Sequence, residues 1–272
     1  MSKSEQHTIK KTVSISGTGL HSGKEVSATF RPAEAGSGII FVRSDLPGHP
    51  GIKADLRNVS STVRGTNLGE VHTVEHILSA LYALSITNLY VELDGPEPPS
   101  LDGSSKLYCD LIMKAGISAQ GSNAKSIKIR EPVIVMESGK CLVALPSDRF
   151  SVSFMINYPV DFIGTQFYEF ELSGNKYLSE IAPARTYGFI SEVEALKKQG
   201  LALGASPKCA VAIGKDGYLT KLRFEDELVR HKILDLIGDL SLLQAEIKAH
   251  IVGVRSGHDL NIKLAKKIEE VG

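Results

Sequence analysis

Short runs of alternating apolar and polar residues make up the first third of the chain, and clusters of glycine, proline and serine separate them. This alternation is typical of strands with one buried face. Glycine and proline between the runs mark the turns that join such strands. The predicted strands of this half lie at residues 8–15, 25–30, 39–43 and 88–93.

The spacing of apolar residues changes to a helical period at residues 74–84. The positions that carry this period are Ile77, Leu78, Leu81 and Leu84. Thr73 is the expected N-cap, because its hydroxyl can accept a hydrogen bond from the first turn. A second helix is predicted at residues 105–115, and Gly116 follows it in a position that tolerates a left-handed conformation.

The second half of the chain repeats this order after a small, polar segment at residues 118–126, which we expect to be a linker. The predicted strands lie at residues 127–135, 140–145, 150–158, 167–172 and 249–254. The predicted helices lie at residues 191–199, 225–244 and 259–270. Strands followed by helices in both halves favour an α+β fold with two similar domains, each a layered sheet-and-helix unit, and not a doubly wound sheet. We place the domains at residues 1–120 and 126–272.

Composition changes this picture little but excludes several classes of protein. Of 272 residues, 42% are hydrophobic and 23% charged, and 31 basic residues balance 31 acidic ones. This balance gives no sign of a nucleic-acid partner. The N-terminal residues contain no continuous apolar stretch, so we expect no secretory signal. No segment approaches the roughly 18 consecutive apolar residues that a membrane span needs. Three widely separated cysteines argue against a disulfide framework and favour a reducing compartment such as the cytoplasm.

The first candidate for chemistry is His72-Thr73-Val74-Glu75-His76. It matches the H-x-x-E-H pattern of inverted zinc peptidases, in which two histidines share a helix face beside a glutamate base. With Thr73 as N-cap, however, His72 lies outside the helix and loses its register with His76. The match is short, so an ordinary helix start with a histidine by chance stays open as the alternative.

The second candidate is the helix predicted at residues 225–244. Its apolar stripe consists of Val229, Ile233, Leu236, Leu240 and Leu243. On the other side His231, Asp235 and Asp239 follow one another at intervals of four residues. Side chains at that spacing lie about 5–6 Å apart, so a histidine and a carboxylate can bind one metal ion. A solvated polar face is the alternative, although Leu228 and Leu242 lie on the same side.

Two further histidines stand in glycine-containing turns. His258 lies in Arg255-Ser256-Gly257-His258-Asp259, between a predicted strand and the last helix, where a histidine is well placed for acid–base chemistry. His21 lies in the segment GLHSG at residues 19–23. An exposed surface histidine is the alternative for both.

Together these segments resemble one family, the UDP-3-O-acyl-N-acetylglucosamine deacetylases, which commit a sugar nucleotide to lipid A synthesis. The resemblance extends from Thr8 to about Ile268. The matching segments are GTGLHSGKEV, TVEHILSALYALSITNLYVEL, LDGSS, ARTYGF, LRFEDELVRHKILDLIGDL and SGHDLN. The FEDE-x-VRHK-x-LD-x-IGDL match is long and ordered, and therefore far more specific than the isolated HxxEH.

The resemblance implies a Zn²⁺ site formed by His76, His231 and Asp235. Two neutral imidazoles and one carboxylate leave a tetrahedral zinc ion one open position for water or substrate. The resemblance also implies that Glu75 is the general base for the hydrolytic water. His258 is then the acid that gives a proton to the leaving amine.

Supporting roles follow from the same resemblance. Asp239 is expected to orient His258 and raise its pKa, and Thr186 to donate its hydroxyl to the tetrahedral oxyanion. Lys232 is expected to meet the sugar-diphosphate part of the substrate. Residues 187–214 are expected to form a passage for the fatty acyl chain.

The apolar residues of that passage would be assigned to the core by their pattern alone. They are Phe189, Ile190, Val193, Leu196, Leu201, Leu203 and Val211. Tyr187 stands where the family usually has Phe, which adds a hydroxyl to a sugar-facing position. With His21 it completes the expected substrate contacts. The connection at residues 67–73 is short, which predicts a trimmed hairpin before the first helix.

We therefore expect an active site between the domains, with Glu75 and His76 from one and His231 and Asp235 from the other. The expected reaction is removal of the N-acetyl group from an acylated UDP-sugar by a monomeric zinc enzyme. Two rivals stay open. One is a zinc peptidase that uses His72, and the other is a binding module in which the polar helix face is merely structural.

Overall fold

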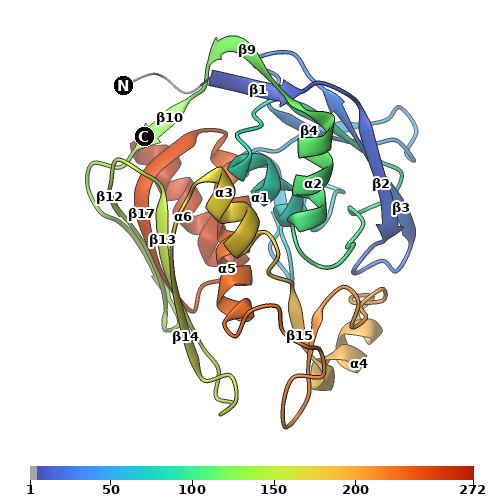
Figure 1. Cartoon of the computed structure of the whole chain (residues 1–272), viewed down its shortest axis with the longest axis vertical. Helices are drawn as coiled ribbons and strands as arrows, with labels where there is room; N and C mark the ends of the chain where they lie inside the picture. The colour runs from blue at the N-terminus through green and yellow to red at the C-terminus, as the bar shows by residue number, and fades with distance from the viewer. Residues whose placement is uncertain (1–4) are drawn as a thin grey trace.

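Two β-sheets enclose a central layer of helices in the computed structural model, which describes residues 5–272 (Figure 1). The first sheet has the strand order β2-β3-β8-β4-β5. Its strands are β2 (Val13–Thr18), β3 (Glu25–Pro32), β8 (Leu89–Leu93), β4 (Ile39–Arg43) and β5 (Gly51–Lys53). β8 runs parallel to β4, and the other neighbours are antiparallel.

The second sheet repeats this arrangement with the order β11-β12-β17-β13-β14. Five of its six strands are β11 (Val133–Glu137), β12 (Lys140–Pro146), β17 (Glu246–Val254), β13 (Ser151–Asn157) and β14 (Thr165–Glu171). The sixth, β10 (Ser126–Lys128), pairs in parallel with β17 outside this order. In each sheet the last strand in chain order lies between the second and the third, antiparallel to the former and parallel to the latter. The expected α+β fold is confirmed, and the two sheets share one strand topology.

Each unit contributes one helix before its last strand and one after it. These are α1 (Glu75–Ala83) and α2 (Lys106–Ala115) in the first unit, and α5 (Glu227–Leu240) and α6 (His258–Val271) in the second. Helix α1 packs against α5 between the sheets (Figure 1). At the crossing, a Cβ added to Gly238 would lie 2.2 Å from the carbonyl oxygen of Glu75, so only glycine permits this approach.

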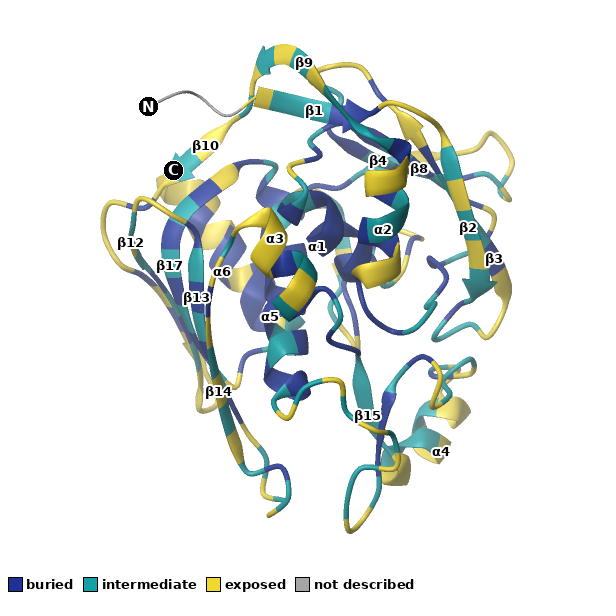
Figure 2. Cartoon of the chain, viewed as in Figure 1, coloured by how far each residue is buried: buried dark blue, intermediate teal, exposed yellow. Residues whose placement is uncertain are grey.

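One continuous cluster of buried apolar side chains includes residues of both units, among them Phe30, Phe41, Phe154 and Phe170. Figure 2 shows α1 and most of α5 in the dark blue of buried residues. The division into domains at 1–120 and 126–272 therefore stays a prediction.

Each unit carries an insertion before the helix that precedes its last strand. In the first unit it holds the 3-10 helix η1 (Leu56–Asn58) and the hairpin of β6 (Val59–Ser61) and β7 (Asn67–Leu68). In the second unit it holds α3 (Gly174–Lys176), the π-helix η2 (Tyr177–Ile181), β15 (Tyr187–Phe189), α4 (Ile190–Lys198) and β16 (Val211–Ile213). β15 and α4 project below the helical layer (Figure 1).

Several sequence-based boundaries were wrong. The expected linker at residues 118–126 is largely strand β9 (Ile117–Asn123), which pairs with β1 (Glu5–Ile9) and is followed by β10 (Ser126–Lys128). Backbone pairing needs no apolar side chain, so the small polar composition did not reveal it. The runs at 8–15 and 127–135 are each broken into two strands.

The long helix is also shorter than predicted. It ends at Leu240, and the 3-10 helix η3 (Ser241–Leu243) follows it. Gln244 then adopts a left-handed conformation with φ of 51°, which stops the helical chain. Among the described residues no helix is both long and apolar enough to cross a membrane.

Candidate catalytic and metal-binding site

The start of α1 differs from the sequence-based prediction. Thr73 is not the N-cap, because it adopts a left-handed conformation with φ of 53°, and its N–H donates to Asn67 Oδ1 at 3.1 Å. The helix begins at Glu75, and Val74 precedes it without a side-chain cap. His72 lies outside the helix and is exposed, as its loss of register with His76 predicted. The peptidase-like reading of H-x-x-E-H thus lacks its helical geometry.

The polar face of α5 is buried. His231 and Asp235 are 3% exposed and Asp239 is 0% exposed, because this face packs toward α1. The solvated-face alternative for the helix is wrong. Three ionisable groups are held away from water, where each must find a partner or a cation.

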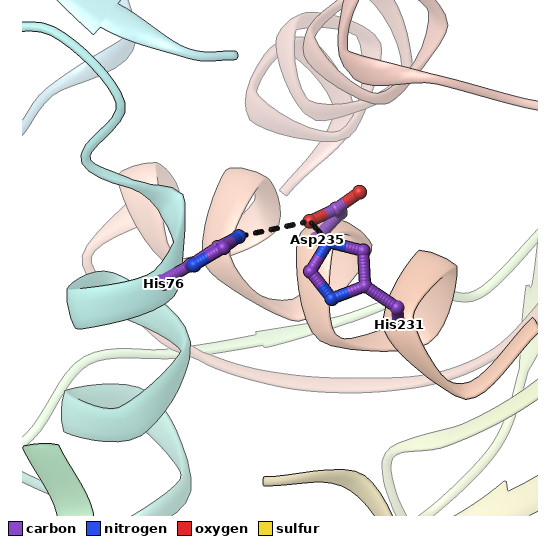
Figure 3. A group of neighbouring side chains, drawn as sticks. All are labelled: His76, His231 and Asp235. Atoms are coloured by element: carbon purple, nitrogen blue, oxygen red, sulfur yellow. Dashed lines mark ion pairs between the residues drawn. The ribbon is translucent and has the colours of Figure 1, made fainter. Parts of the chain in front are cut away.

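Three ligand atoms converge between α1 and α5. His231 Nε2 lies 3.3 Å from Asp235 Oδ1, and His76 Nε2 lies 3.7 Å from the same oxygen. Figure 3 shows His76 on one helix pointing toward His231 and Asp235 on the other. Among residues 5–272, Asp235 Oδ1 has no hydrogen-bond partner although it is buried. A cation would compensate this oxygen, so the three residues fit a metal ion.

The protonation of these groups suits metal binding. Burial, together with the charge of His231, lowers the pKa of His76 to about 3. Burial also lowers the pKa of His231, whose Nδ1 faces the Ala184 carbonyl at 3.2 Å and so leaves Nε2 free. Burial alone would raise the pKa of Asp235, but His231 and Lys232 outweigh it and hold the pKa far below its usual range.

An acid–base pair lies beside these ligands. His258 Nε2 is 3.9 Å from Glu75 Oε1 and 3.8 Å from Asp235 Oδ2. Burial raises the pKa of Glu75 to about 7. Burial would lower the pKa of His258, but the carboxylates of Asp239 and Asp235 outweigh it and raise the pKa to about 9. A carboxylate able to accept a proton thus faces an imidazolium able to donate one.

Asp239 is hydrogen-bonded to this histidine, and its orienting role stays a prediction. Its Oδ2 accepts from His258 Nδ1 at 2.9 Å and from Asn261 Nδ2 at 2.8 Å. Its Oδ1 accepts from the Thr66 hydroxyl at 2.5 Å, and the Thr66 N–H donates to Glu75 Oε2 at 2.9 Å. Sequence reasoning missed Thr66 and Asn261. Asn261 could have been found, since His258 begins α6 and the two share a helix face at i and i+3.

Lys232 and Thr186 border the cluster. Lys232 Nζ donates to Asp235 Oδ2 at 2.7 Å. Burial would lower the pKa of Lys232, but Asp235 outweighs it and raises the pKa. Thr186 and His76 line one small hollow. Thr186 follows Arg185, whose guanidinium forms a buried ion pair of 2.7 Å with Glu227 at the start of α5.

Tyr187 and Phe189 form an aromatic wall with a residue that the sequence did not single out, Tyr158. The hydroxyls of Tyr158 and Tyr187 are 2.8 Å apart. The Tyr187 ring centroid lies 6.1 Å from that of His231, in an edge-on arrangement. The Phe189 centroid lies 5.6 Å from that of Tyr158. The structure thus places Tyr187 beside a candidate metal ligand and pairs its additional hydroxyl.

The remaining expected contacts lie in the insertion and in the loop that it touches. Leu203 and Ile190 are each 47% exposed, so the core alternative is wrong for both, whereas Val211 is buried. His21 is partly buried, and its Nδ1 accepts from the Ala202 N–H at 3.2 Å. Burial lowers the pKa of His21, although Glu97 opposes this.

A larger cavity of about 450 Å³ lies at the seam between the units, away from this cluster. Tyr82, Phe150 and Gln244 contribute to its walls. None of the candidate metal ligands or acid–base residues lines it, so size alone does not locate the chemistry here.

The fold and the buried cluster together define an α+β enzyme of the hydrolase class, and comparison with known proteins agrees. The chain belongs to the LpxC family, UDP-3-O-acyl N-acetylglycosamine deacetylase, whose family model matches residues 6–270. The resemblance inferred from the motifs is confirmed, and the protein is a deacetylase.

Its relatives align over nearly the whole chain. The UDP-3-O-acyl-N-acetylglucosamine deacetylase of Citrifermentans bemidjiense is 42% identical over 269 residues, which cover 97% of this chain and 88% of the relative. The protein of that name from Nostoc sp. strain PCC 7120 is 41% identical over 274 residues, with 97% and 98% covered. That of Bdellovibrio bacteriovorus is 40% identical over 269 residues, with 97% and 89% covered.

Proposed function

We propose that the enzyme hydrolyses the N-acetyl group of UDP-3-O-acyl-N-acetylglucosamine to acetate and UDP-3-O-acyl-glucosamine, the committed step of lipid A biosynthesis. We further propose that it acts in the cytoplasm as a monomer and depends on Zn²⁺. The observation that carries the proposal is the unpartnered oxygen of Asp235 between two neutral histidines, directly beside the Glu75–His258 pair.

The donor set favours zinc among common metal ions. Nitrogen from His76 and His231 with one oxygen from Asp235 suits a tetrahedral ion with one open position, whereas Ca²⁺ and Mg²⁺ prefer oxygen donors alone. When bound there, the ion would supply Lewis-acid activation of water and of the amide carbonyl.

The protein side chains then move the protons. Glu75, which the Thr66 N–H orients, takes a proton from the attacking water as the new bond to the acetyl carbon forms. The Thr186 hydroxyl donates to the developing oxyanion. As the C–N bond breaks, His258, which Asp239 orients, gives its proton to the leaving amine. Acetate and the free amino sugar are the products.

We assign substrate recognition to side chains that border the metal-binding and acid–base residues. Lys232 offers a buried ammonium for the sugar diphosphate, and the wall of Tyr187 and Phe189 offers an apolar surface to the sugar. The insertion at residues 187–214 offers exposed apolar side chains such as Leu203 for the acyl chain.

The test is a deacetylation assay on UDP-3-O-acyl-N-acetylglucosamine with purified enzyme, before and after a chelator and then with added Zn²⁺. We expect activity to disappear with the chelator and to return with zinc. Activity that survives complete metal removal would refute the zinc proposal. Stoichiometric metal without turnover of this substrate would refute the substrate and favour the binding-module rival.

A further inference from the structure

Glu97 is a buried carboxylate outside the cluster described above. It follows β8 and is 1% exposed. Its Oε1 accepts from the N–H groups of His21 at 3.0 Å and Ser22 at 2.6 Å. Its Oε2 receives the His21 N–H at 3.2 Å and faces the Thr73 hydroxyl at 3.5 Å. Backbone donors therefore balance its charge, and the loop at residues 19–23 is wrapped around it.

Gly19 of this loop packs closely against the carboxylate. A Cβ added to Gly19 would lie 2.5 Å from Glu97 Oε1, so the backbone is in direct contact with the acidic group. The next residue, Leu20, lines the small hollow that His76 and Thr186 also line. Glu97 therefore contacts the residues on both sides of a side chain that lines this hollow.

The same loop also holds the insertion. The N–H of Ala202 donates to His21 Nδ1 at 3.2 Å, and that of Leu203 donates to the His21 carbonyl at 3.1 Å. The N–H of Gly204 donates to the Leu20 carbonyl at 3.1 Å. A Cβ added to Gly204 would lie 2.1 Å from the Gly19 carbonyl oxygen, so the two backbones are in contact.

The other side of Glu97 faces the start of α1. Thr73, whose hydroxyl is nearest to Oε2, precedes Glu75 by two residues and is held in a left-handed conformation. The buried carboxylate of Glu97 thus contacts both the segment that precedes the general base and the loop that is hydrogen-bonded to the insertion.

We propose that Glu97 is a positioning residue that fixes the position of the acyl-chain passage relative to α1. It thereby sets the acyl-chain length that the enzyme prefers. This inference rests on the proposed function, because it assumes that residues 187–214 receive the acyl chain. Binding energy from the chain raises the rate only if the bound chain places the amide correctly at the reacting groups. A shift of the passage relative to α1 therefore changes which chain length achieves this.

A role in folding alone and a role in positioning the acyl-chain passage predict different results. A folding role would lower kcat/KM by the same factor for every acyl chain, since it reduces only the amount of active enzyme. A role in positioning the passage changes the relative kcat/KM values of substrates with different acyl-chain lengths. The test measures kcat/KM for a series of UDP-3-O-acyl-N-acetylglucosamines that differ by two methylenes, together with the metal content of each variant.

For Glu97→Ala we expect at least a tenfold loss on the preferred chain, a smaller loss on shorter chains and unchanged metal content. Glu97→Gln retains one acceptor oxygen and should lie between the parent and the alanine variant. Glu92→Gln is the control, because Glu92 is a partly exposed residue of β8 that pairs with Arg31 on the sheet, and it should keep the parental profile.

Gly204→Ala disturbs the contact between the insertion and the Gly19 carbonyl of the same loop, and it keeps the test valid if Glu97→Ala does not fold. It should shift the profile in the same way. Equal losses at all chain lengths in Glu97→Gln and Gly204→Ala would overturn the proposal. A parent enzyme that shows no preference for acylated over unacylated UDP-N-acetylglucosamine would instead refute the proposed substrate.

Discussion

The crossing of α1 and α5 and the insertion at residues 187–214 are built in opposite ways. Every residue of α1 except Tyr82 is buried, whereas no residue of α4 is buried (Figure 2). The crossing fixes its side chains by core packing, with Gly238 letting the helices touch. The insertion is held to the loop at 19–23 mainly by backbone hydrogen bonds. The candidate catalytic groups therefore lie in the core, whereas the residues proposed to select the substrate lie in a more exposed segment.

The largest effect should come from substitutions of the proposed metal ligands at the crossing of α1 and α5. In Asp235→Ala we expect zinc to fall to near zero and activity to be lost, because removal of a direct ligand costs more than the roughly 10–100-fold typical of its outer partners. Elemental analysis of protein purified without added metal measures this. His72→Ala is the control and should keep its zinc. A nearly full zinc complement in Asp235→Ala would exclude this ligand set.

A second substitution at the crossing separates metal binding from proton transfer. Glu75→Ala should keep its zinc but lower kcat by about 10²–10⁴-fold, since a general base acts in the transition state. Steady-state kinetics and elemental analysis on the same sample measure both quantities. Turnover at the parental rate would show that another group is the base.

A substitution in the insertion should have a smaller effect on kcat/KM, and only for a substrate that carries the acyl chain. Leu203 is about half exposed, so an acyl chain would bury about half of its side chain, worth about 1 kcal/mol. Leu203→Gln should therefore lower kcat/KM about fivefold on the acylated substrate and leave the unacylated one unchanged. Met136→Gln, at an exposed apolar position of β11, is the control. Equal losses on both substrates would show that Leu203 does not contact the chain.

The smallest effect concerns the border between the two regions. Tyr187→Phe removes the hydroxyl that pairs with Tyr158, which should lower the free energy of unfolding by about 0.5–1.5 kcal/mol and change kcat little. Urea denaturation of Tyr187→Phe, Tyr158→Phe and the variant with both substitutions measures the coupling energy between the two hydroxyls. Losses that simply add would show that the two hydroxyls do not interact.

The sequence predicted the helices and strands of this fold better than it predicted which elements pack against them. The helical period placed His231, Asp235 and Asp239 on one face, but it could not decide whether water or α1 covers that face. That decision depends on Gly238, whose contact with Glu75 joins residues far apart in the chain. The chemistry was recognised through motifs, not through periodicity.

Other features left no local signal. Thr66 has no helical or strand spacing to Asp239, so only the fold brings its hydroxyl there. Thr73 has the composition of an N-cap, yet tertiary contacts with Asn67 and Glu97 place it in a left-handed turn. Strand β9 lacked an apolar pattern because its partner, β1, satisfies it through the backbone.

The proposed metal ligands are divided between α1 and α5, and this division would couple metal concentration to the unfolding equilibrium. A cation held by His76 from one unit and by His231 and Asp235 from the other binds the folded chain and not the unfolded one, in which these residues are separated. At a free concentration one hundred times its dissociation constant, such an ion would stabilise the fold by about 2.7 kcal/mol. With the proposed zinc site, the melting temperature is expected to rise with free zinc, and thermal unfolding at graded zinc concentrations would measure the metal affinity.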